Sequence, residues 1–187
     1  KRTVAALGDR VFDVLIIGGG IFGACAAWDA TLRGLSVALV ERTDFAAGTS
    51  ANSYKFVHGG IRYLQHADLP RLRRSCHERG ALLRIAPHLV SPIPVVIPTY
   101  GNGRQGKWLL GAGMLLYDAL TLDRNLGIPD PKQKIPISRF LDAGAVRNMF
   151  PGILADGLTG GAVFCDGQMY NPTRLVLAFV RSAVENG

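Results

Sequence analysis

The chain alternates short hydrophobic runs with polar segments that are rich in glycine or proline. Residues 11–20, VFDVLIIGGG, are mostly apolar and end in glycines, which predicts a buried parallel strand. IFGACAAWDATLRG follows and predicts a helix that stops at Gly34. LSVALVE, residues 35–41, predicts a second strand. The three segments together have the length of a βαβ unit, in which a helix joins two parallel strands.

The rest of the chain predicts further helices separated by loops and extended segments. Residues from Arg42 to about Ala67 are expected to form one long loop. Asp68 and Pro70 then predict a helix start, because aspartate caps free N–H groups and proline fits the first turn. This helix should end near Ala86. The remaining expectations are an extended segment in LVSPIPVVIP, helices over 108–122 and from Ser138 to Met149, a strand and turn in GGAVFCDGQMY, and a helix opened by Asn171 and Pro172.

Composition and charge narrow the classes of function. Of the 187 residues, 48% are hydrophobic, which is enough for a packed core, and the net charge of +7 suits an anionic partner. Only 8% are aromatic, without the aromatic and basic interleaving of single-strand binders, so no nucleic-acid partner is expected. The three cysteines are far apart in the sequence and form no metal or disulfide pattern, which favours a reducing, cytoplasmic compartment and no metal site.

Two segments bear on a membrane role. WLLGAGMLLYDALTL, residues 108–122, is too short to cross a bilayer and contains Asp118, so it predicts a buried or interfacial helix. RLRRSCHERGALLR, residues 71–84, is strongly basic. A solvated basic helix face is one interpretation, and a peripheral contact with the cytoplasmic face of a membrane is the other.

The main chemical motif lies between the first predicted strand and helix. Gly18, Gly20 and Gly23 form the pattern G-x-G-x-x-G, and Glu41 ends the second predicted strand. In a dinucleotide site the first glycine permits the tight turn, the second lets the pyrophosphate approach the backbone, and the third allows close helix–strand packing. The helix start offers N–H groups to the phosphates, and an acidic side chain binds the ribose diol. A glycine-rich turn without a ligand is the alternative.

The segment after Glu41 favours FAD over NAD. RTDFAAGTSANSYKFVHGG is a long stretch of small and hydroxyl residues, suited to run along an extended cofactor towards its reactive ring. Arg42 stands next to Glu41 and only slightly weakens the preference for a free ribose 2′-hydroxyl.

The stretch from Asp13 to Gln65 resembles the N-terminal region of FAD-dependent glycerol-3-phosphate dehydrogenases, within the D-amino-acid-oxidase and glycine-oxidase superfamily of flavoproteins. The pattern S-x-x-S-x-K-x-x-H-G-G-x-R-Y-L, beginning at Ser50, is the more specific part. RGALLRIAPHLV, GMLLYDAL and FCDGQMYNPTRLVLAFVRSAVENG extend the resemblance over nearly the whole chain. Phe22 and Tyr54 depart from the family, which usually has smaller residues there.

The resemblance implies a set of residues that contact FAD. Thr49, Ser50 and Ser53 are implied to hydrogen-bond the pyrophosphate and ribityl chain, and Lys55, Phe56 and Val57 to run beside the isoalloxazine ring. His58 is implied to lie near the ring, with Gly59 and Gly60 allowing close backbone approach. The full implied set of cofactor residues is Gly18, Gly20, Ile21, Phe22, Gly23, Glu41, Arg42, Thr49, Ser50, Ser53, Lys55, Phe56, Val57, His58, Gly59 and Gly60.

The same resemblance implies the reaction. His58, Arg62 and Tyr63 are implied as catalytic residues, with the Arg62 fork suited to a phosphate dianion and the Tyr63 phenol adding a hydrogen bond. The implied chemistry is oxidation of sn-glycerol 3-phosphate to dihydroxyacetone phosphate, with hydride transfer to flavin N5 and electrons passed to quinone. Two alternatives stay open: an oxidoreductase of the superfamily acting on an amine or hydroxy acid, and a non-catalytic fragment that binds FAD or another nucleotide.

The expected fold class is therefore α/β, with a Rossmann-like FAD-binding βαβ unit, helical and extended insertions, and part of a two-domain flavoprotein. Residues 9–67 are expected to form the βαβ unit and flavin loop. Residues 68–160 are expected to contribute to a substrate or cap region. Residues 161–187 are expected to return to the FAD domain and end before its next strand.

Overall fold

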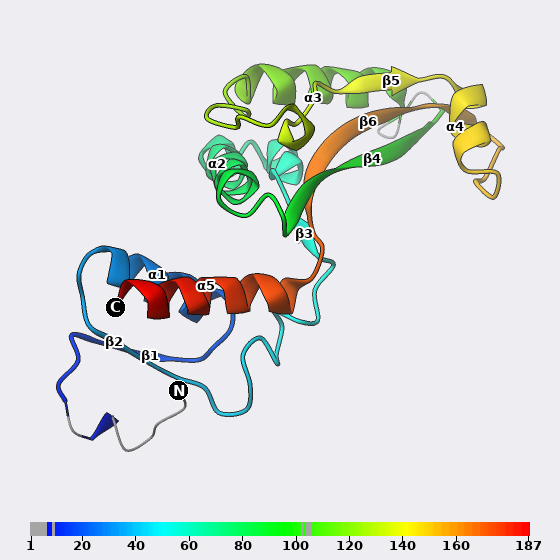
Figure 1. The fold of residues 1–187 in the computed structure, drawn as a ribbon. Helices are drawn as coiled ribbons and strands as arrows, with labels where there is room; N and C mark the ends of the chain where they lie inside the picture. The colour runs from blue at the N-terminus through cyan, green and yellow to red at the C-terminus, as the bar shows by residue number, and fades with distance from the viewer. Residues whose placement is uncertain (1–6, 9, 102, 104–105) are drawn as a thin grey trace. The chain divides into compact units, whose positions relative to one another are not determined.

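The computed structural model describes residues 7–8, 10–101, 103 and 106–187, and divides the chain into two compact units. Unit 1 contains the chain up to Lys55 together with Met169–Gly187, and unit 2 contains Phe56–Gln168. Unit 1 is therefore built from two segments that are distant in sequence, whereas unit 2 is one continuous segment. Figure 1 shows the elements of each.

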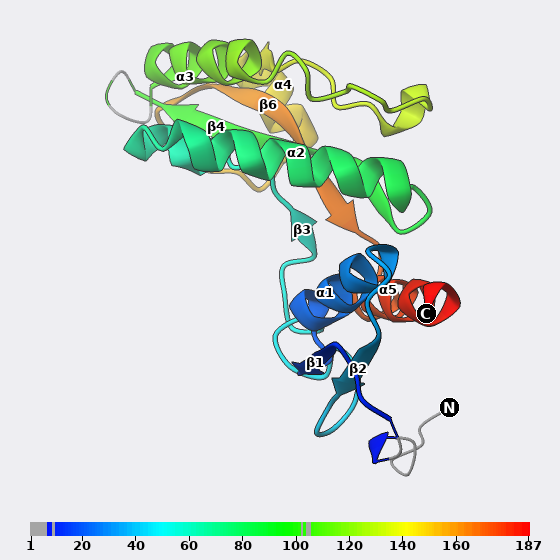
Figure 2. The same ribbon diagram turned by 90° about the vertical axis from the view of Figure 1, so that its left-hand side faces the viewer.

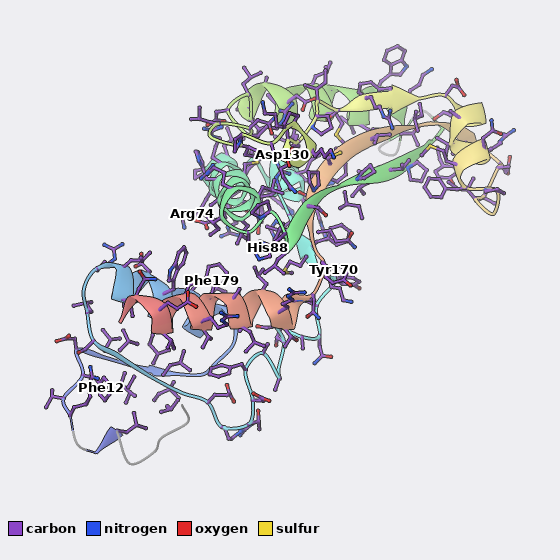
Figure 3. All side chains as sticks on the ribbon, viewed as in Figure 1. Phe12, Arg74, His88, Asp130, Tyr170 and Phe179 are labelled. Carbon is purple, nitrogen blue, oxygen red and sulfur yellow. The ribbon has the colours of Figure 1, made fainter. Side chains whose placement is uncertain are left out.

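Unit 1 contains the expected βαβ arrangement. Strands β1 (Val14–Ile17) and β2 (Val37–Val40) pair in parallel, and helix α1 (Ile21–Leu32) joins them. Gly34, at φ 78°, follows the helix end as predicted. Helix α5 (Pro172–Asn186) packs along α1. Small alanines on α1 are buried, and the rings of Trp28 and Phe179 lie 5.3 Å apart between their centroids; Figure 3 labels Phe179 on α5.

The first strand pairs in parallel as predicted, but the prediction that it is buried was wrong. Burial alternates along β1, and the side chains of Leu15 and Ile17 are 61% and 84% exposed. Successive side chains of a strand point to opposite faces, and α1 packs against β1 on one of them. A continuous apolar run of this kind is typical of a strand that is covered on both faces.

Unit 2 is a mixed unit around the long strand β6 (Leu158–Met169), whose last residue belongs to unit 1. The strand order is β3-β6-β4, and β5 also pairs with β6. Helices α2 and α3 both pack against β4, and Figure 2 shows their course. The elements in chain order are β3 (Phe56–Val57), the 3-10 helix η2 (Ile61–His66), α2 (Leu69–Ile85), β4 (Val90–Tyr100), α3 (Lys107–Leu120), the 3-10 helix η3 (Pro131–Gln133), β5 (Arg139–Leu141), α4 (Ala143–Met149) and β6.

Local start signals placed several elements correctly. The Asp68 carboxylate accepts a hydrogen bond from the Arg71 N–H at the start of α2, and Asn171 does the same for Arg174 at the start of α5. The segment LVSPIPVVIP lies in strand β4 from its second residue, Val90, as its prolines indicated. In these segments, a short polar or proline signal determines the backbone locally.

Two boundary predictions were wrong. The expected long loop after Arg42 contains β3 and η2, because β3 gains hydrogen bonds from the distant strand β6. The expected helix from Ser138 instead begins after Asp142, whose carboxylate accepts from the Ala145 N–H, and residues 139–141 form β5. In both cases long-range pairing overrides the local pattern. Among the described residues, no helix is long and apolar enough to cross a membrane.

Candidate functional site

The glycine turn, defined here as Gly18–Gly23 between β1 and α1, has the backbone that its sequence requires. Gly18 has a φ of 112°, a conformation that side chains rarely adopt. A Cβ on Gly23 would collide with the Gly18 carbonyl oxygen, so only glycine lets α1 start this close to the strand. Gly20 is the N-cap residue and provides no side-chain cap for α1. The first N–H groups of the helix therefore depend on other partners.

Ser50 provides one such partner. Its Oγ lies 3.0 Å from the Ile21 nitrogen and accepts that N–H, and a Cβ on Gly20 would approach this same oxygen to 3.2 Å. The hydroxyl-rich loop thus reaches the glycine turn from 29 residues further along the chain. Ser53 Oγ accepts from the Lys55 N–H at 3.3 Å, and Lys55 has a left-handed backbone at φ 60°. Thr49 is exposed in the turn that precedes Ser50.

Glu41 lies on the other side of the glycine turn. One carboxylate oxygen accepts the Gly19 N–H at 2.7 Å, and the other accepts the Thr43 N–H at 2.9 Å. The hydrogen bonds from the backbone N–H groups of Thr43 and Gly19 hold the pKa of Glu41 below its usual range. The carboxylate is therefore ionised and retains acceptor capacity on both oxygens. Its neighbour Arg42 is exposed.

These features fit a dinucleotide phosphate site on their geometry. Gly18, Gly19 and Gly20 bring no Cβ to the turn, α1 starts there without a cap from its own N-cap side chain, and an ionised carboxylate follows the end of β2. Phe22, which is 89% exposed, lies at the start of α1.

The second group of predicted site residues lies in unit 2. Here the His-Gly-Gly turn, defined as His58–Gly60, leads from β3 into η2. Phe56 and Val57 pair with Gln168 and Gly167 of β6. Gly60 has a left-handed φ of 78° and is the N-cap of η2, which carries Arg62 and Tyr63.

His58 of this turn contacts Tyr63 of η2, which is partly buried. The imidazole of His58 is exposed and meets the Tyr63 ring edge-on, with centroids 6.0 Å apart. The guanidinium of Arg71 lies 5.3 Å from the centroid of the same tyrosine ring. Arg62 is exposed on η2. Tyr63 therefore contacts both the His58 imidazole and the Arg71 guanidinium within unit 2.

Beneath the turn lies a buried polar network that sequence reasoning missed, comprising Cys76, Arg79, Tyr117 and Asp166. Arg79 Nη1 donates to Asp166 Oδ1 at 2.8 Å, to the Cys165 carbonyl at 3.1 Å and to Tyr117 Oη at 3.2 Å. Asp166 Oδ1 also accepts the Gly59 N–H, and the Cys76 thiol donates to the Gly59 carbonyl at 3.0 Å. The network therefore contacts both sides of the Gly59 residue.

Burial fixes the protonation of this network. Burial raises the pKa of the Cys76 thiol, partly offset by its hydrogen bond to Tyr117 and by the Arg79 charge. Burial likewise raises the pKa of Tyr117 above its usual range, against the opposing effect of Arg79. Both groups remain protonated at neutral pH, so the Cys76 thiol can donate to the Gly59 carbonyl, while Arg79 and Asp166 form a buried ion pair.

The interpretation of residues 71–84 as a solvated basic face was wrong for Arg79. The side chain of Arg79 is 1% exposed, although Arg71 and Arg74 on the same helix are exposed, and Figure 3 labels Arg74. A signal was present in the sequence, since Leu72, Cys76, Arg79 and Leu83 recur at helical spacing and all are buried in the structure. That spacing placed Arg79 on the apolar face of α2.

The predicted site residues thus form two local groups. Gly18 to Lys55 lie in unit 1, where Ile21, Glu41 and Ser50 meet around the glycine turn. Phe56 to Tyr63 lie in unit 2 around the His-Gly-Gly turn.

A Rossmann-like glycine turn with an acidic residue after its second strand defines a nucleotide-binding class of fold, and comparison with known proteins specifies the family. Residues 13–187 match the family model described as FAD dependent oxidoreductase, and the chain belongs to this family. This confirms the predicted flavoprotein superfamily, the α/β fold class and FAD as the cofactor.

Several curated proteins similar to the chain are glycerol-3-phosphate dehydrogenases. The Synechocystis protein of that name is 39% identical over 186 residues, covering 100% of this chain and 32% of the relative. Glycerol-3-phosphate dehydrogenase 1 of Mycobacterium bovis is 43% identical and covered to 36%. The human mitochondrial glycerol-3-phosphate dehydrogenase is 40% identical, covering 94% of this chain and 24% of that protein. The chain thus spans about a third or less of the length of these relatives.

Solved structures show the same fold. The glycerol-3-phosphate dehydrogenase from Bacillus halodurans, complexed with FAD, aligns with a TM-score of 0.66 at 25% identity, covering 98% of this chain and 27% of that one. Glycine oxidase from Bacillus cereus aligns with a TM-score of 0.55 at 24% identity, covering 95% of this chain and 46% of that one, and shows the fold alone.

Proposed function

We propose that the protein containing this chain oxidises sn-glycerol 3-phosphate to dihydroxyacetone phosphate with FAD as its cofactor. The observation that carries this proposal is the His-Gly-Gly turn followed by Arg62 and Tyr63, in a chain 39–43% identical to glycerol-3-phosphate dehydrogenases. Bound FAD would supply the two-electron acceptor, namely its flavin N5. The protein would supply orientation, charge and proton handling.

The residues of unit 2 have distinct proposed roles. The Arg62 guanidinium binds the substrate phosphate, because its fork matches two phosphate oxygens. The Tyr63 hydroxyl adds a hydrogen bond to the substrate. The His58 imidazole handles the proton that leaves the C2 hydroxyl, since the ring is exposed and an imidazole nitrogen can accept a proton. The edge-on contact with Tyr63 supports this role by orienting the His58 ring.

The residues of unit 1 are proposed to hold the adenine-side half of FAD. The glycine turn and the start of α1 receive the pyrophosphate, and Glu41 accepts hydrogen bonds from the ribose diol. Ser50 already joins the helix start, which supports a role for the hydroxyl-rich loop in closing this site. The remaining proposed cofactor residues are Ile21, Phe22, Arg42, Thr49, Ser53, Lys55, Phe56, Val57 and His58–Gly60.

Three further proposals concern the whole protein. Electrons pass from the reduced cofactor to quinone, and the protein contacts the cytoplasmic face of a membrane peripherally. The exposed arginines on α2, Arg71 and Arg74, support such a contact by their charge. Residues 68–160 contribute to a substrate or cap region, while residues 9–67 and 161–187 belong to the FAD domain.

The test is anaerobic reduction of the flavin in the intact protein. We expect glycerol 3-phosphate to bleach the visible flavin absorption, and glycine and sarcosine to leave it unchanged. Arg62→Met should raise the KM for glycerol 3-phosphate by about 100-fold, because a charge-assisted bidentate contact is lost. Arg74→Met, which removes another exposed arginine, is the matched control. Bleaching by the amines instead would contradict the proposed substrate.

A further inference from the structure

We propose that Cys76, Arg79, Tyr117 and Asp166 are positioning residues that fix the His-Gly-Gly turn in the geometry needed for turnover. This inference rests on the proposed function, because it assigns a task to residues beneath the proposed catalytic face. None of the four was expected from the sequence as part of the site. All lie in unit 2 together with the turn itself.

The network holds the Gly59 backbone from both sides. The Gly59 N–H donates to Asp166, and the Gly59 carbonyl accepts from the Cys76 thiol at 3.0 Å. These partners come from β6 and α2, elements that are 107 and 17 residues away along the chain. A loop residue is seldom held at both of its backbone polar groups by buried side chains, because loops usually face solvent. The position of Gly59 is therefore set by the core of unit 2.

The fit around Gly59 leaves no room for adjustment. A Cβ at this position would collide with the Arg79 guanidinium and the Tyr117 hydroxyl, which are both buried. The next residue, Gly60, has a left-handed backbone, and a Cβ there would crowd Tyr63 and Ser75. Because Gly59 lies between His58 and the start of η2, displacement of Gly59 shifts both the imidazole and the helix bearing Arg62 and Tyr63.

Stability alone does not explain the ion pair between Arg79 and Asp166. Buried ion pairs are often no more stabilising than well-packed apolar residues of similar size, since both charges lose their hydration. In the described part of the chain, Arg79 Nη2 is buried without a hydrogen-bond partner, which adds to that cost. The pair nevertheless orients Asp166 Oδ1, which accepts from both Arg79 Nη1 and the Gly59 N–H. Orientation of the turn is the benefit that this geometry provides.

The mildest test removes the Cys76 thiol in the intact, FAD-loaded protein. Cys76→Ala loses the donor to the Gly59 carbonyl, whereas Cys76→Ser keeps a donor of similar reach. We expect Cys76→Ala to lower kcat for glycerol 3-phosphate oxidation by about fivefold, the effect of one net hydrogen bond, with little change in flavin content. Cys76→Ser should restore most of kcat. Arg79→Lys keeps the charge but moves the donor, because all three hydrogen bonds come from Nη1 and the lysine side chain is shorter, and it should lower kcat further.

Val146→Ala is the matched stability control. Val146 is fully buried on α4 in the same unit, and its apolar side chain takes no part in the hydrogen-bond network. Its truncation should lower the thermal midpoint at least as much as Cys76→Ala while leaving kcat unchanged. If Val146→Ala lowers kcat to the same extent, or if Cys76→Ser fails to restore it, the network is only structural and the inference is overturned.

A second readout separates this inference from the proposed function. The rate at which diethyl pyrocarbonate modifies His58, followed by mass spectrometry, needs no substrate. Loosening the turn should release the imidazole from the edge of Tyr63, so His58 should react faster in Cys76→Ala and Arg79→Lys than in the wild type, Cys76→Ser or Val146→Ala. If the wild type does not oxidise glycerol 3-phosphate, the proposed function fails, yet this pattern still shows that the network orients His58. Equal rates in all variants overturn the inference.

Discussion

The glycine turn of unit 1 and the His-Gly-Gly turn of unit 2 are both glycine-dependent, but for opposite reasons. At Gly23 the obstacle to a side chain is backbone, the Gly18 carbonyl of the same turn. At Gly59 the obstacle is a set of buried side chains, Arg79 and Tyr117, brought in from distant elements. The first turn is shaped by its own sequence, and the second is shaped by the core on which it rests.

This difference determines how substitutions propagate. A change in the glycine turn acts on partners within the first 50 residues, because Gly18, Glu41 and Ser50 all belong to the βαβ unit and the loop that follows it. A change in the buried network reaches the His-Gly-Gly turn from α2, α3 or β6. Four predictions test this contrast.

The largest effect is expected for Gly23→Ala. The new Cβ meets a backbone oxygen that cannot move without separating α1 from β1, so FAD affinity should fall by about 100-fold, equivalent to roughly 3 kcal/mol of overpacking. Bound flavin after desalting, measured by visible absorption, gives the result. Gly48→Ala is the control in the same unit, since a Cβ there meets nothing within 4 Å. Retention of FAD by Gly23→Ala would show that the turn is adaptable.

Gly59→Ala should be the next most harmful change. Its Cβ meets side chains instead of backbone, and their burial leaves them little room, so turnover should fall by about tenfold or more. FAD binding should fall less than in Gly23→Ala, which a titration with FAD would measure. Gly152→Ala, where a Cβ has open space, should behave as wild type. If Gly59→Ala lowers FAD affinity more than turnover, the proposed difference between the two turns is contradicted.

Ion pairs in the two units should also differ in how much they contribute to the free energy of unfolding. Asp166→Asn leaves the buried Arg79 charge without its counterion, and should lower the free energy of unfolding by about 3–5 kcal/mol. Asp29→Asn removes the Arg33–Asp29 pair on α1, whose side chains are 69% and 62% exposed, and should cause no measurable change. Urea unfolding of the intact protein under matched conditions compares them. Equal losses in the free energy of unfolding would mean that water screens the Arg79–Asp166 pair as it screens the exposed pair.

The smallest effects are expected in the pH dependence of the thermal midpoint. The lowered pKa of Glu41 means that folding favours its ionised form, so its contribution is complete above its ordinary pKa of 4.5 and is lost as the pH falls through the lowered value. The raised pKa of Tyr117 means that folding favours its protonated form, so its contribution is complete below its ordinary pKa of 10.0 and is lost as the pH rises above it.

Two variants separate these pH effects. Glu41→Gln should flatten the fall in midpoint on the acid side only, and Tyr117→Phe should flatten it on the alkaline side only. If Tyr117→Phe also changes the thermal midpoint on the acid side, the phenol affects stability by a route other than its own ionisation.

The sequence predicted those features whose determinants are close together along the chain. The βαβ unit, the glycine turn and the starts of α2 and α5 follow from short motifs such as Asp68 with Pro70. The buried network was missed because Gly59, Arg79, Tyr117 and Asp166 are spread over more than 100 residues and only the packing of unit 2 joins them. Asp166 stood within a buried apolar strand, and an acidic residue in such a run requires a partner that the local pattern does not identify.

The division of unit 1 into two segments has a consequence for the order of folding. Its glycine turn belongs to the first 55 residues, but the buried alanine face of α1 is covered by α5, which begins at Pro172. Closing that contact requires a chain excursion of about 140 residues, and such distant contacts form slowly. Unit 2 is contiguous and is complete before α5 leaves the ribosome. We therefore expect unit 2 to fold first and the glycine turn to become stable only when α5 docks on α1.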